Sequence, residues 1–246
     1  PIELITYFLG FGLTDNEIVM DFFSGSATTA EAVMRNNIGG NHNRFILIQL
    51  PELIDSTKKA TSENSKKVVL NAISVLDELK KPHYITELAK ERIRRAGKKI
   101  KEESPLTTQD LDTGFRVLKL DSTNMQDIYY SPKDISQADL FSQVDNVKPD
   151  RTGEDLLFQV MLELGATLDS EIETTTVAGK TIYNVAEGYL VACFDPDVTD
   201  EVVKAIAQMQ PAYAVLRDTS MKDDSTATNF EQIFKTYSPD TVTRIL

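Results

Sequence analysis

The segment at residues 21–29 reads D-F-F-S-G-S-A-T-T and places small polar residues where an apolar run gives way to a helical pattern. The apolar run, at residues 18–20, predicts a buried strand. Gly25 can adopt backbone angles that a residue with a Cβ atom resists, and Thr28 or Thr29 can cap the helix. The first N–H groups of a helix have no partner inside it, so they attract a carboxylate or a phosphate. The segment therefore predicts a ligand-binding loop.

Two common phosphate-binding loops do not fit this segment. The dinucleotide loop needs G-x-G-x-x-G, of which only Gly25 is present, and the P-loop needs a Gly-Lys pair that does not follow here. Asp21, at the end of the predicted strand, can instead hold an ammonium group, while backbone N–H groups of the turn hold a carboxylate. These two groups form the methionine end of S-adenosylmethionine, which we therefore expect at the loop.

Composition excludes several kinds of site. The single cysteine, Cys193, excludes an internal disulfide framework and any multi-cysteine zinc site, and suits a reducing cytoplasm. With two histidines in the chain, we expect no histidine-rich metal site. No stretch approaches about 18 consecutive apolar residues, so no transmembrane helix is expected. Pro1 begins within a helical pattern, and we read it as a cut inside a longer protein.

The charge of the chain is strongly uneven. The formal net charge is −12, and residues 151–246 carry −9 of it, with 7 Lys and Arg against 16 Asp and Glu. Against this background the run K-E-R-I-R-R-A-G-K-K-I-K at residues 90–101 is basic and could contact phosphates. A solvated helix whose apolar stripe packs inward is the interpretation that we favour for such a run.

We expect three parts, at residues 1–54, 55–104 and 105–246. The first part alternates helix and strand, and apolar strands separated by a helix predict a parallel sheet. The second part reads as two helices broken near Lys81-Pro82, because a proline ends a helix at the preceding residue. The elements predicted for the first part are helices at 2–9 and 28–37 and strands at 17–23 and 45–50.

The third part, residues 105–246, is predicted to be a small α/β domain with its own core. A polar loop is expected at 139–151, and Gly165 and Thr199 mark a helix end and a helix start. The predicted strands lie at 115–120, 181–185, 189–194, 212–216 and 242–246, with the second and third forming a hairpin, and the predicted helices at 154–164, 199–209 and 229–237.

The sequence D-F-F-S-G-S-A-T-T-A-E-A-V-M resembles the cofactor-binding motif of amino-directed DNA methyltransferases. It is most similar to that of the modification subunit of type III restriction-modification systems. The flanks agree, since P-I-E-L-I at residues 1–5 is similar to the segment before this motif, and R-F-I-L-I-Q-L-P-E at 44–52 to the strand that addresses the cofactor's ribose. V-L-R-D at 215–218 and N-F-E-Q-I-F at 229–234 are similar to the tail of those subunits.

The resemblance implies an α/β fold with a partial Rossmann-like methyltransferase half that binds S-adenosylmethionine, a helical connector and a small C-terminal α/β domain. Ala27 stands where many relatives have glycine, and Gln49 where many have a carboxylate. Ribose binding then passes to Gln49 or to Glu52, and position favours Gln49. The implied cofactor-binding residues are Pro1, Glu3, Asp21, Phe22, Phe23, Ser24, Gly25, Ser26, Thr28 and Gln49.

The catalytic motif of this family is not in the chain. Methyl transfer to an exocyclic amine needs an Asp-Pro-Pro-Tyr type motif that orients the amine and stacks the flipped base. The nearest match, F-D-P-D at residues 194–197, has one proline and no following aromatic, and we favour a turn there. In the family's motif order the catalytic loop and the target-recognition domain precede the cofactor loop. We therefore expect the C-terminal portion of an adenine-specific DNA methyltransferase, inactive by itself, with no catalytic residue of its own.

Other readings of the chain stay open. The resemblance implies three partners: DNA through the full-length protein, a second modification subunit, and the restriction subunit, which is a helicase and nuclease. Residues 105–246 could chiefly be an interaction module that builds the homodimer or docks the restriction subunit. A complete methyltransferase with its motifs in the opposite order would need residues 194–197 to be catalytic. A cluster of three carboxylates and a lysine could suggest a magnesium-dependent nuclease, at Asp218, Lys222, Asp223 and Asp224. A polar surface loop explains these residues better.

Overall fold

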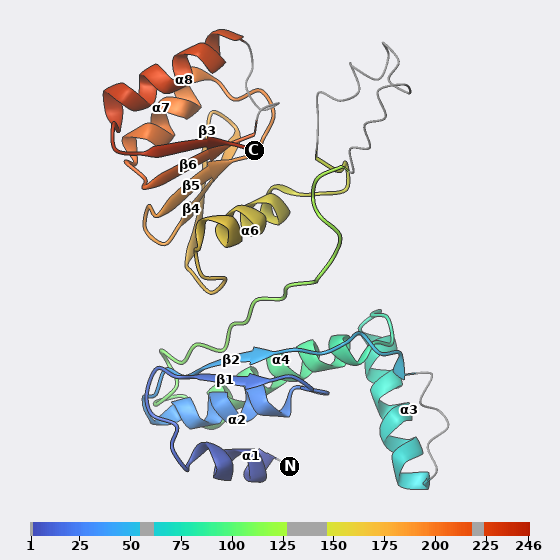
Figure 1. Cartoon of the computed structure of the whole chain (residues 1–246). Helices are drawn as coiled ribbons and strands as arrows, with labels where there is room; N and C mark the ends of the chain where they lie inside the picture. Colours follow the sequence, from blue (N-terminus) through green and yellow to red (C-terminus); the bar gives the residue numbers. More distant parts are fainter. Residues whose placement is uncertain (1, 55–61, 127–146, 218–223) are drawn as a thin grey trace. The chain divides into compact units, whose positions relative to one another are not determined.

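The computed structural model describes residues 2–54, 62–126, 147–217 and 224–246, with side chains from residue 229 in the last range. The chain divides into two compact units, Pro1–Arg116 and Val117–Leu246, which are called unit 1 and unit 2 below (Figure 1). The helices predicted for residues 55–104 lie within unit 1. The functional division of the chain into three parts stays a prediction.

Unit 1 is built around two parallel strands joined by a helix. Strand β1 (Ile18–Asp21) pairs with β2 (Arg44–Leu47), and α2 (Thr28–Asn36) with a 3-10 turn (Asn37–Gly39) connects them. These elements confirm the predicted parallel pair, although both strands are shorter than predicted. The other helices, also as predicted, are α1 (Ile2–Leu9), α3 (Glu63–Glu78) and α4 (Ile85–Glu103).

Only one face of the strand pair is covered. Successive side chains of a strand point to opposite faces, and Phe45 and Leu47 pack with buried residues of α2 and α4. The strand at 17–23 was predicted to be buried. This is only half right, because α2 and α4 both pack against one face of the strand pair and leave the other face exposed. The side chains of the other face are between 41% and 50% exposed: Ile18, Met20, Ile46 and Ile48.

Unit 2 is a five-stranded mixed sheet with helices on both faces. The strand order is β3-β4-β5-β6-β7, with antiparallel pairing from β3 to β5 and parallel pairing from β5 to β7. Figure 1 shows α7 and α8 on one side of the sheet and α6 on the other. The strands are β3 (Ile172–Val177), β4 (Lys180–Val185), β5 (Leu190–Cys193), β6 (Tyr213–Leu216) and β7 (Val242–Ile245), and the helices α6 (Gly153–Leu164), α7 (Asp200–Gln208) and α8 (Asp224–Tyr237).

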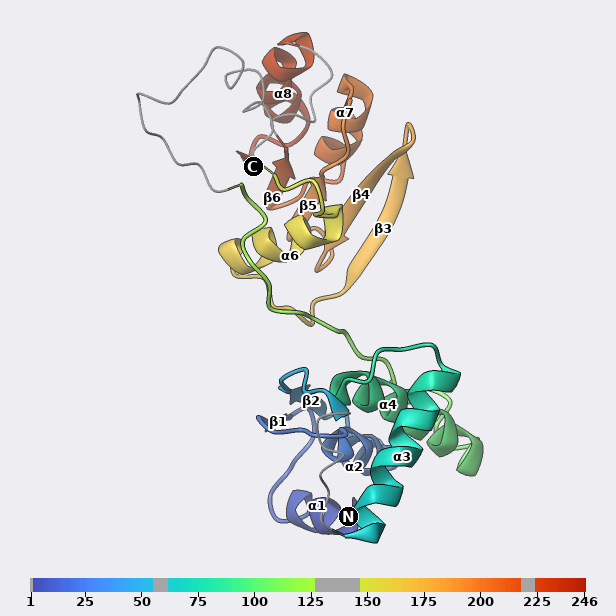
Figure 2. The ribbon, with the colours of Figure 1, turned by 90° about the vertical axis from the view of Figure 1, so that its right-hand side faces the viewer.

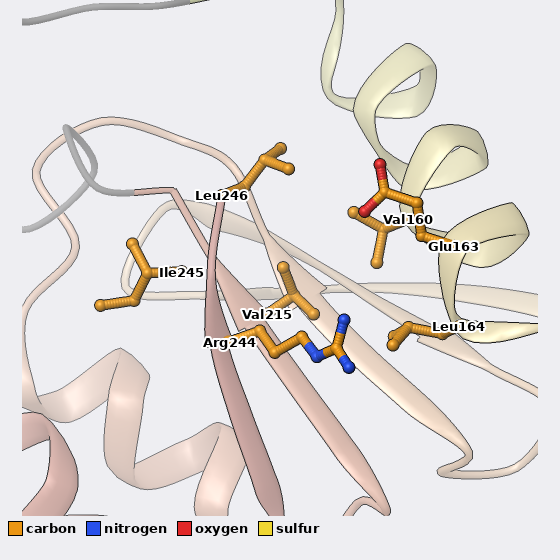
Figure 3. Close-up of a pocket in the computed structure, with 7 residues that line it drawn as sticks. All are labelled: Val160, Glu163, Leu164, Val215, Arg244, Ile245 and Leu246. Carbon is orange, nitrogen blue, oxygen red and sulfur yellow. The ribbon is translucent and has the colours of Figure 1, made fainter.

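The sheet of unit 2 separates two apolar clusters. Alternate residues of β5 and β6 face α7 and α8, where Phe230 and Phe234 pack, and the remaining ones face α6. Cys193 is fully buried in the first cluster, and this burial raises the pKa of its thiol. A small hollow of about 120 Å³ remains between α6 and β7, lined by Glu163 and Arg244 among others (Figure 3).

The third part differs from its prediction at two places. Strand β3 was not predicted, because its sequence I-E-T-T-T-V has no apolar alternation: it is an edge strand with four exposed residues in its centre. Figure 2 shows it beside β4 at the edge of the sheet. The predicted strand at 115–120 is wrong. Phe115 instead packs on α4, with the guanidinium of Arg94 5.5 Å from its ring centre, and Leu120 is fully exposed.

The helix boundaries of unit 2 follow the predicted signals. Gly165 ends α6 in a left-handed conformation with φ +79°, and Thr199 is the residue that precedes α7, although its side chain makes no capping hydrogen bond. Of the predicted loop at 139–151, residues 139–146 lie outside the described residues. Within the described ranges, no helix has the length and apolar character needed to cross a membrane.

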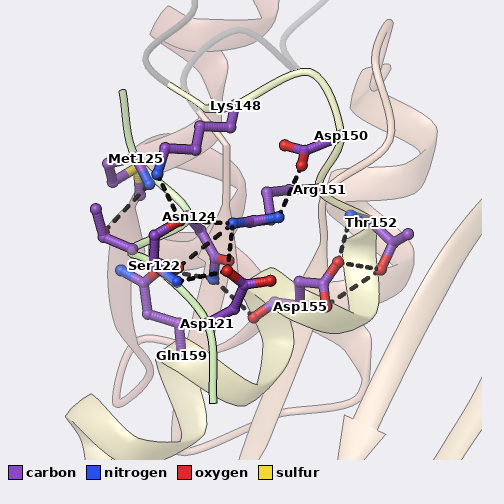
Figure 4. Close-up of polar contacts among 11 residues, drawn as sticks. Asp121, Ser122, Asn124, Met125, Lys148, Asp150, Arg151, Thr152, Asp155 and Gln159 are labelled. Atoms are coloured by element: carbon purple, nitrogen blue, oxygen red, sulfur yellow. Dashed lines mark hydrogen bonds and ion pairs between the residues drawn. The ribbon is translucent and has the colours of Figure 1, made fainter. Parts of the chain in front are cut away.

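A reciprocal pair of side chains begins α6. The Thr152 hydroxyl accepts a hydrogen bond from the Asp155 N–H (3.3 Å), and the Asp155 carboxylate accepts one from the Thr152 N–H (2.7 Å). Figure 4 shows this pair beside Arg151, which donates to the Ser122 hydroxyl (3.0 Å) and thereby holds the preceding segment. The N–H and the hydroxyl of Thr152 hold the pKa of Asp155 below its ordinary value of 3.8.

We predict that Asp155→Asn lowers the melting temperature at neutral pH and that this deficit disappears in acid. Because the folded-state pKa is depressed, the ionised carboxylate stabilises the fold above its ordinary pKa, and that stabilisation is lost as the pH falls through the folded-state pKa. Thermal denaturation between pH 7 and pH 2 measures the deficit in melting temperature at neutral pH and its disappearance in acid. Glu154→Gln, in the same helical turn but outside the pair, is the control. A deficit that does not change with pH contradicts the assignment.

Candidate cofactor-binding site

The loop between β1 and α2 is held in an unusual backbone conformation. Gly25 has φ +50°, as its lack of a Cβ atom allows, and Ala27 has φ +62°, which residues with a Cβ atom rarely adopt. Ala27 is the residue that precedes α2, and no side chain caps the helix. The predicted capping by Thr28 or Thr29 is therefore wrong, because both lie inside the helix and their hydroxyls bond elsewhere.

Asp21 joins the end of β1 to both ends of this loop. Its Oδ1 accepts a hydrogen bond from the Phe23 N–H (3.1 Å), and its Oδ2 accepts one from the Thr29 hydroxyl (2.5 Å). A carboxylate has about four acceptor positions, so Asp21 can hold these donors and still accept from an ammonium group. Binding of an ammonium group by Asp21 stays a prediction.

Gln49, which follows β2, holds the middle of the loop. Its Oε1 accepts from the Gly25 N–H (2.8 Å), and its Nε2 donates to the backbone oxygen of Leu50 (3.1 Å). The Ser24 N–H bonds to the backbone oxygen of Ile48 (3.3 Å). Gln49 therefore positions the loop in this structure, and its amide keeps one acceptor position on Oε1 and one N–H on Nε2 beyond these bonds.

Arg92 of α4 is the residue that the motif analysis missed. Its Nη1 donates to the hydroxyls of Ser26 and Thr28, both at 2.9 Å, and its Nη2 lies 3.2 Å from the carboxylate of Glu31. Glu31 lies in α2, is 8% exposed and also pairs with Arg35 at 3.3 Å. The sequence signal was weak, since the residue only flanks the buried stripe of α4 within a run of many cations.

Five of the other six cations of this run pair with carboxylates of their own helix. Lys90 pairs with Glu87, and Arg95 pairs with Glu91 at 2.7 Å. The apolar stripe is buried at Ile93, Ala96 and Ile100. The favoured interpretation, a solvated helix with an inward stripe, is therefore confirmed for these positions. Lys98 and Lys99 pair in the same way with Glu102 and Glu103.

The remaining predicted site residues differ in exposure. Phe22 and Phe23 are 60% and 92% exposed, whereas Ser24 is buried and Ser26 is half-buried. Glu3 lies exposed on α1. Pro1 lies outside the described residues. The hydrogen bonds of the loop bring Asp21, Gly25 and Gln49 together.

The hollows of the two units differ in size. An open hollow of about 430 Å³ lies between α2, α3 and α4, within the range of small-molecule sites, and Ser26, Glu31 and Arg92 contribute to its wall. The hollow of unit 2 in Figure 3 is smaller than that range, at about 120 Å³. Among the described residues no group of three or more His, Cys, Asp and Glu side chains is placed to hold a metal.

The alternative sites gain no support. Asp195 of the F-D-P-D segment uses its carboxylate to accept from the Thr181 N–H (2.5 Å), and Asp197 has φ +53°, as in a turn. Of the acidic cluster, Asp218, Lys222 and Asp223 lie outside the described residues, and Asp224 begins α8.

Comparison with known proteins identifies relatives of this chain. The EcoPI Mod subunit of Escherichia phage P1, a type III restriction-modification enzyme, is 30% identical over 216 residues, 85% of this chain and 28% of the relative. The EcoP15I Mod subunit of Escherichia coli is 30% identical over 213 residues, 84% of this chain and 27% of the relative. The StyLTI Mod subunit of Salmonella typhimurium is 32% identical over 117 residues, 47% of this chain and 15% of the relative.

No family model matches the chain. The chain spans little more than a quarter of the length of the two relatives that match most of it. These alignments confirm the resemblance found in the sequence. The chain is a homologue of the Mod subunits of type III restriction-modification enzymes.

Proposed function

We propose that this chain is the cofactor-binding and C-terminal portion of an adenine-specific DNA methyltransferase of a type III restriction-modification system. The observation that carries the proposal is the loop at residues 21–29, fixed by Asp21 and Gln49 at the start of a buried helix, in a homologue of Mod subunits. S-adenosylmethionine, when bound, supplies an activated methyl group on a positively charged sulfur. The residues of this chain bind and orient its methionine end.

Each part of the loop has a distinct task in this proposal. Asp21 accepts the ammonium group, and the start of α2 attracts the carboxylate through its unpaired N–H groups and the positive end of the helix. Phe22 and Phe23, both exposed, offer apolar surface beside the ligand. Gln49 addresses the ribose with the acceptor position and the N–H that its amide keeps beyond its bonds to Gly25 and Leu50.

The bare face of β1 and β2 supports the idea of a partial Rossmann-like domain. Strands of parallel sheets are normally buried on both faces, whereas Ile18, Met20, Ile46 and Ile48 are about half exposed. The relatives are more than three times as long as the region they share with this chain. We propose that another part of the longer enzyme covers this face and brings the catalytic loop and the target-recognition domain.

We predict that the 246-residue chain binds S-adenosylhomocysteine weakly, with a Kd roughly between micromolar and millimolar, because only part of the site is present. Asp21→Asn keeps the size of the side chain but removes its charge, so it should weaken binding about tenfold or more. Asp21→Ala should abolish binding. Calorimetry measures the affinities, and thermal denaturation checks the fold.

The matched control is Asp110→Asn, which removes an exposed carboxylate of the same unit and should leave the affinity within about twofold. Undiminished binding by both Asp21 variants would remove Asp21 from the site. No binding by the wild-type chain at millimolar ligand would contradict the proposal that this chain holds the cofactor by itself.

We also predict that the chain transfers no methyl group to DNA, because cofactor binding without the catalytic motif does not orient the acceptor amine. The assay is transfer of radiolabelled methyl groups to mixed genomic DNA. Incorporation that disappears on Pro196→Ala would contradict the prediction and favour a complete methyltransferase with catalytic residues at 194–197.

A second function, a protein-interaction module, is favoured by the charge and independence of unit 2. It has two apolar clusters of its own, and residues 151–246 carry a net charge of −9, which opposes binding to a polyanion. We propose that this unit contacts a second modification subunit or the restriction subunit. Such contacts are compatible with cofactor binding in unit 1.

We predict that Val117–Leu246 alone does not shift DNA in a gel, even at low salt. The complete chain should give at most a weak shift that salt removes, since six of the seven cations in the basic run of α4 are already paired. Comparing the two proteins over a salt series measures this. A salt-resistant shift by Val117–Leu246 would make unit 2 a DNA-binding domain and contradict the interaction role.

A further inference from the structure

We propose that Arg92 is a positioning residue of the cofactor loop, so that helix α4 belongs to the cofactor site although it lies outside the motif. This inference rests on the proposed binding of S-adenosylmethionine at the loop. Arg92 contacts the loop and the first turns of α2, and its role does not require it to contact the ligand.

The contacts of Arg92 span the point where the loop becomes helix. Its Nη1 bonds to the hydroxyl of Ser26 on one side of Ala27 and to that of Thr28 on the other, both at 2.9 Å. Ala27 between them is fully buried and has φ +62°. The guanidinium therefore bridges the most strained residue of the loop and fixes the two side chains that flank it.

The loop needs such an external contact because its own sequence supplies no cap. The residue that precedes α2 is Ala27, which has no side-chain oxygen to accept from the first N–H groups of the helix. A left-handed conformation at a residue with a Cβ atom persists only where surrounding contacts fix it. Arg92 provides two of these contacts, and Gln49 provides a third at Gly25.

Glu31 fixes the orientation of Arg92. One of its carboxylate oxygens lies 3.2 Å from Nη2 of Arg92, and the other lies 3.3 Å from Arg35. Glu31 is 8% exposed, so its charge is shielded from water and depends on these partners. A planar guanidinium can donate to the carboxylate of Glu31 along one edge and to the two hydroxyls from its other nitrogen. The single nitrogen of a lysine cannot reach both sets of acceptors in this way.

Arg92 differs in this respect from the other cations of the basic run. Arg95, one turn later, pairs with Glu91 of the same helix at 2.7 Å and is more than half exposed. Both arginines contribute to the wall of the 430 Å³ hollow, so their substitution changes the local charge equally. Arg95→Met is therefore a matched control for Arg92→Met.

The test uses the complete 246-residue chain with the substitutions Arg92→Met, Arg92→Lys and Arg95→Met. Calorimetry with S-adenosylhomocysteine measures affinity, and NMR of the ligand-free chain measures exchange of the Gly25 and Ala27 amide protons. Arg92→Met should weaken binding of S-adenosylhomocysteine about tenfold. It should also accelerate exchange of the Gly25 and Ala27 amide protons about tenfold relative to the amide protons of α4. Arg92→Lys should recover part of both effects, and Arg95→Met should change each by less than about twofold.

Ser26→Ala combined with Thr28→Val gives a second route, because it removes the two acceptors and leaves the pair of Arg92 and Glu31 intact. This double variant should accelerate exchange of the Gly25 and Ala27 amide protons. If Arg92→Met does not fold, this variant decides the question. Exchange that is unchanged, or that rises equally throughout unit 1, overturns the positioning role.

Failure of the proposed function gives a different result. If the wild-type chain binds no S-adenosylhomocysteine, the cofactor assignment of the isolated chain fails. The amide exchange of Gly25 and Ala27 then still shows whether Arg92 holds the loop. If the wild type binds and Arg92→Met binds equally well, the cofactor assignment stands and Arg92 has no role in it.

Discussion

The loop of unit 1 depends on the hydrogen bonds that the carboxylate of Asp21 accepts. The carboxylate accepts from the Phe23 N–H and from the Thr29 hydroxyl, so the end of β1 and the first turn of α2 are joined through one side chain. Without this link, the strained turn at Gly25 and Ala27 would keep the side-chain contacts of Gln49 and Arg92 and the backbone bonds of Ser24 and Ala27. The acid expected to recognise the ligand is thus also the residue that shapes the ligand loop.

The secondary structure of this chain follows from local signals wherever those signals are strong. Apolar periodicity and a proline break place α3 and α4, and a glycine after an apolar run ends α6. The signals fail where burial is not local. The alternation at 115–120 is typical of a strand, but Phe115 docks on α4, while β3 is an edge strand whose polar sequence carries no pattern.

The candidate site divides in the same way. The loop and Asp21 could be found from sequence, because a strand, a turn and a helix are contiguous in the chain, whereas Gln49 was named through the resemblance to the methyltransferase motif. The bond from Gly25 to Gln49 spans 24 residues, and those from Arg92 to Ser26 and Thr28 span 66 and 64. Periodicity places Arg92 at the border of the buried stripe of α4, but the packing of α4 on α2 decides which acceptors it reaches.

The charges of the two units bear on whether either unit can bind DNA. A protein that binds a polyanion needs cations that are free to release counterions. Five cations of α4 are paired with Glu87, Glu91, Glu102 and Glu103, Arg92 is paired with Glu31, and residues 151–246 carry a net charge of −9. Contact with DNA in the proposed enzyme therefore falls to other parts of the longer protein. In the proposed function, this chain contributes the methionine end of the cofactor site and an acidic unit suited to protein contacts.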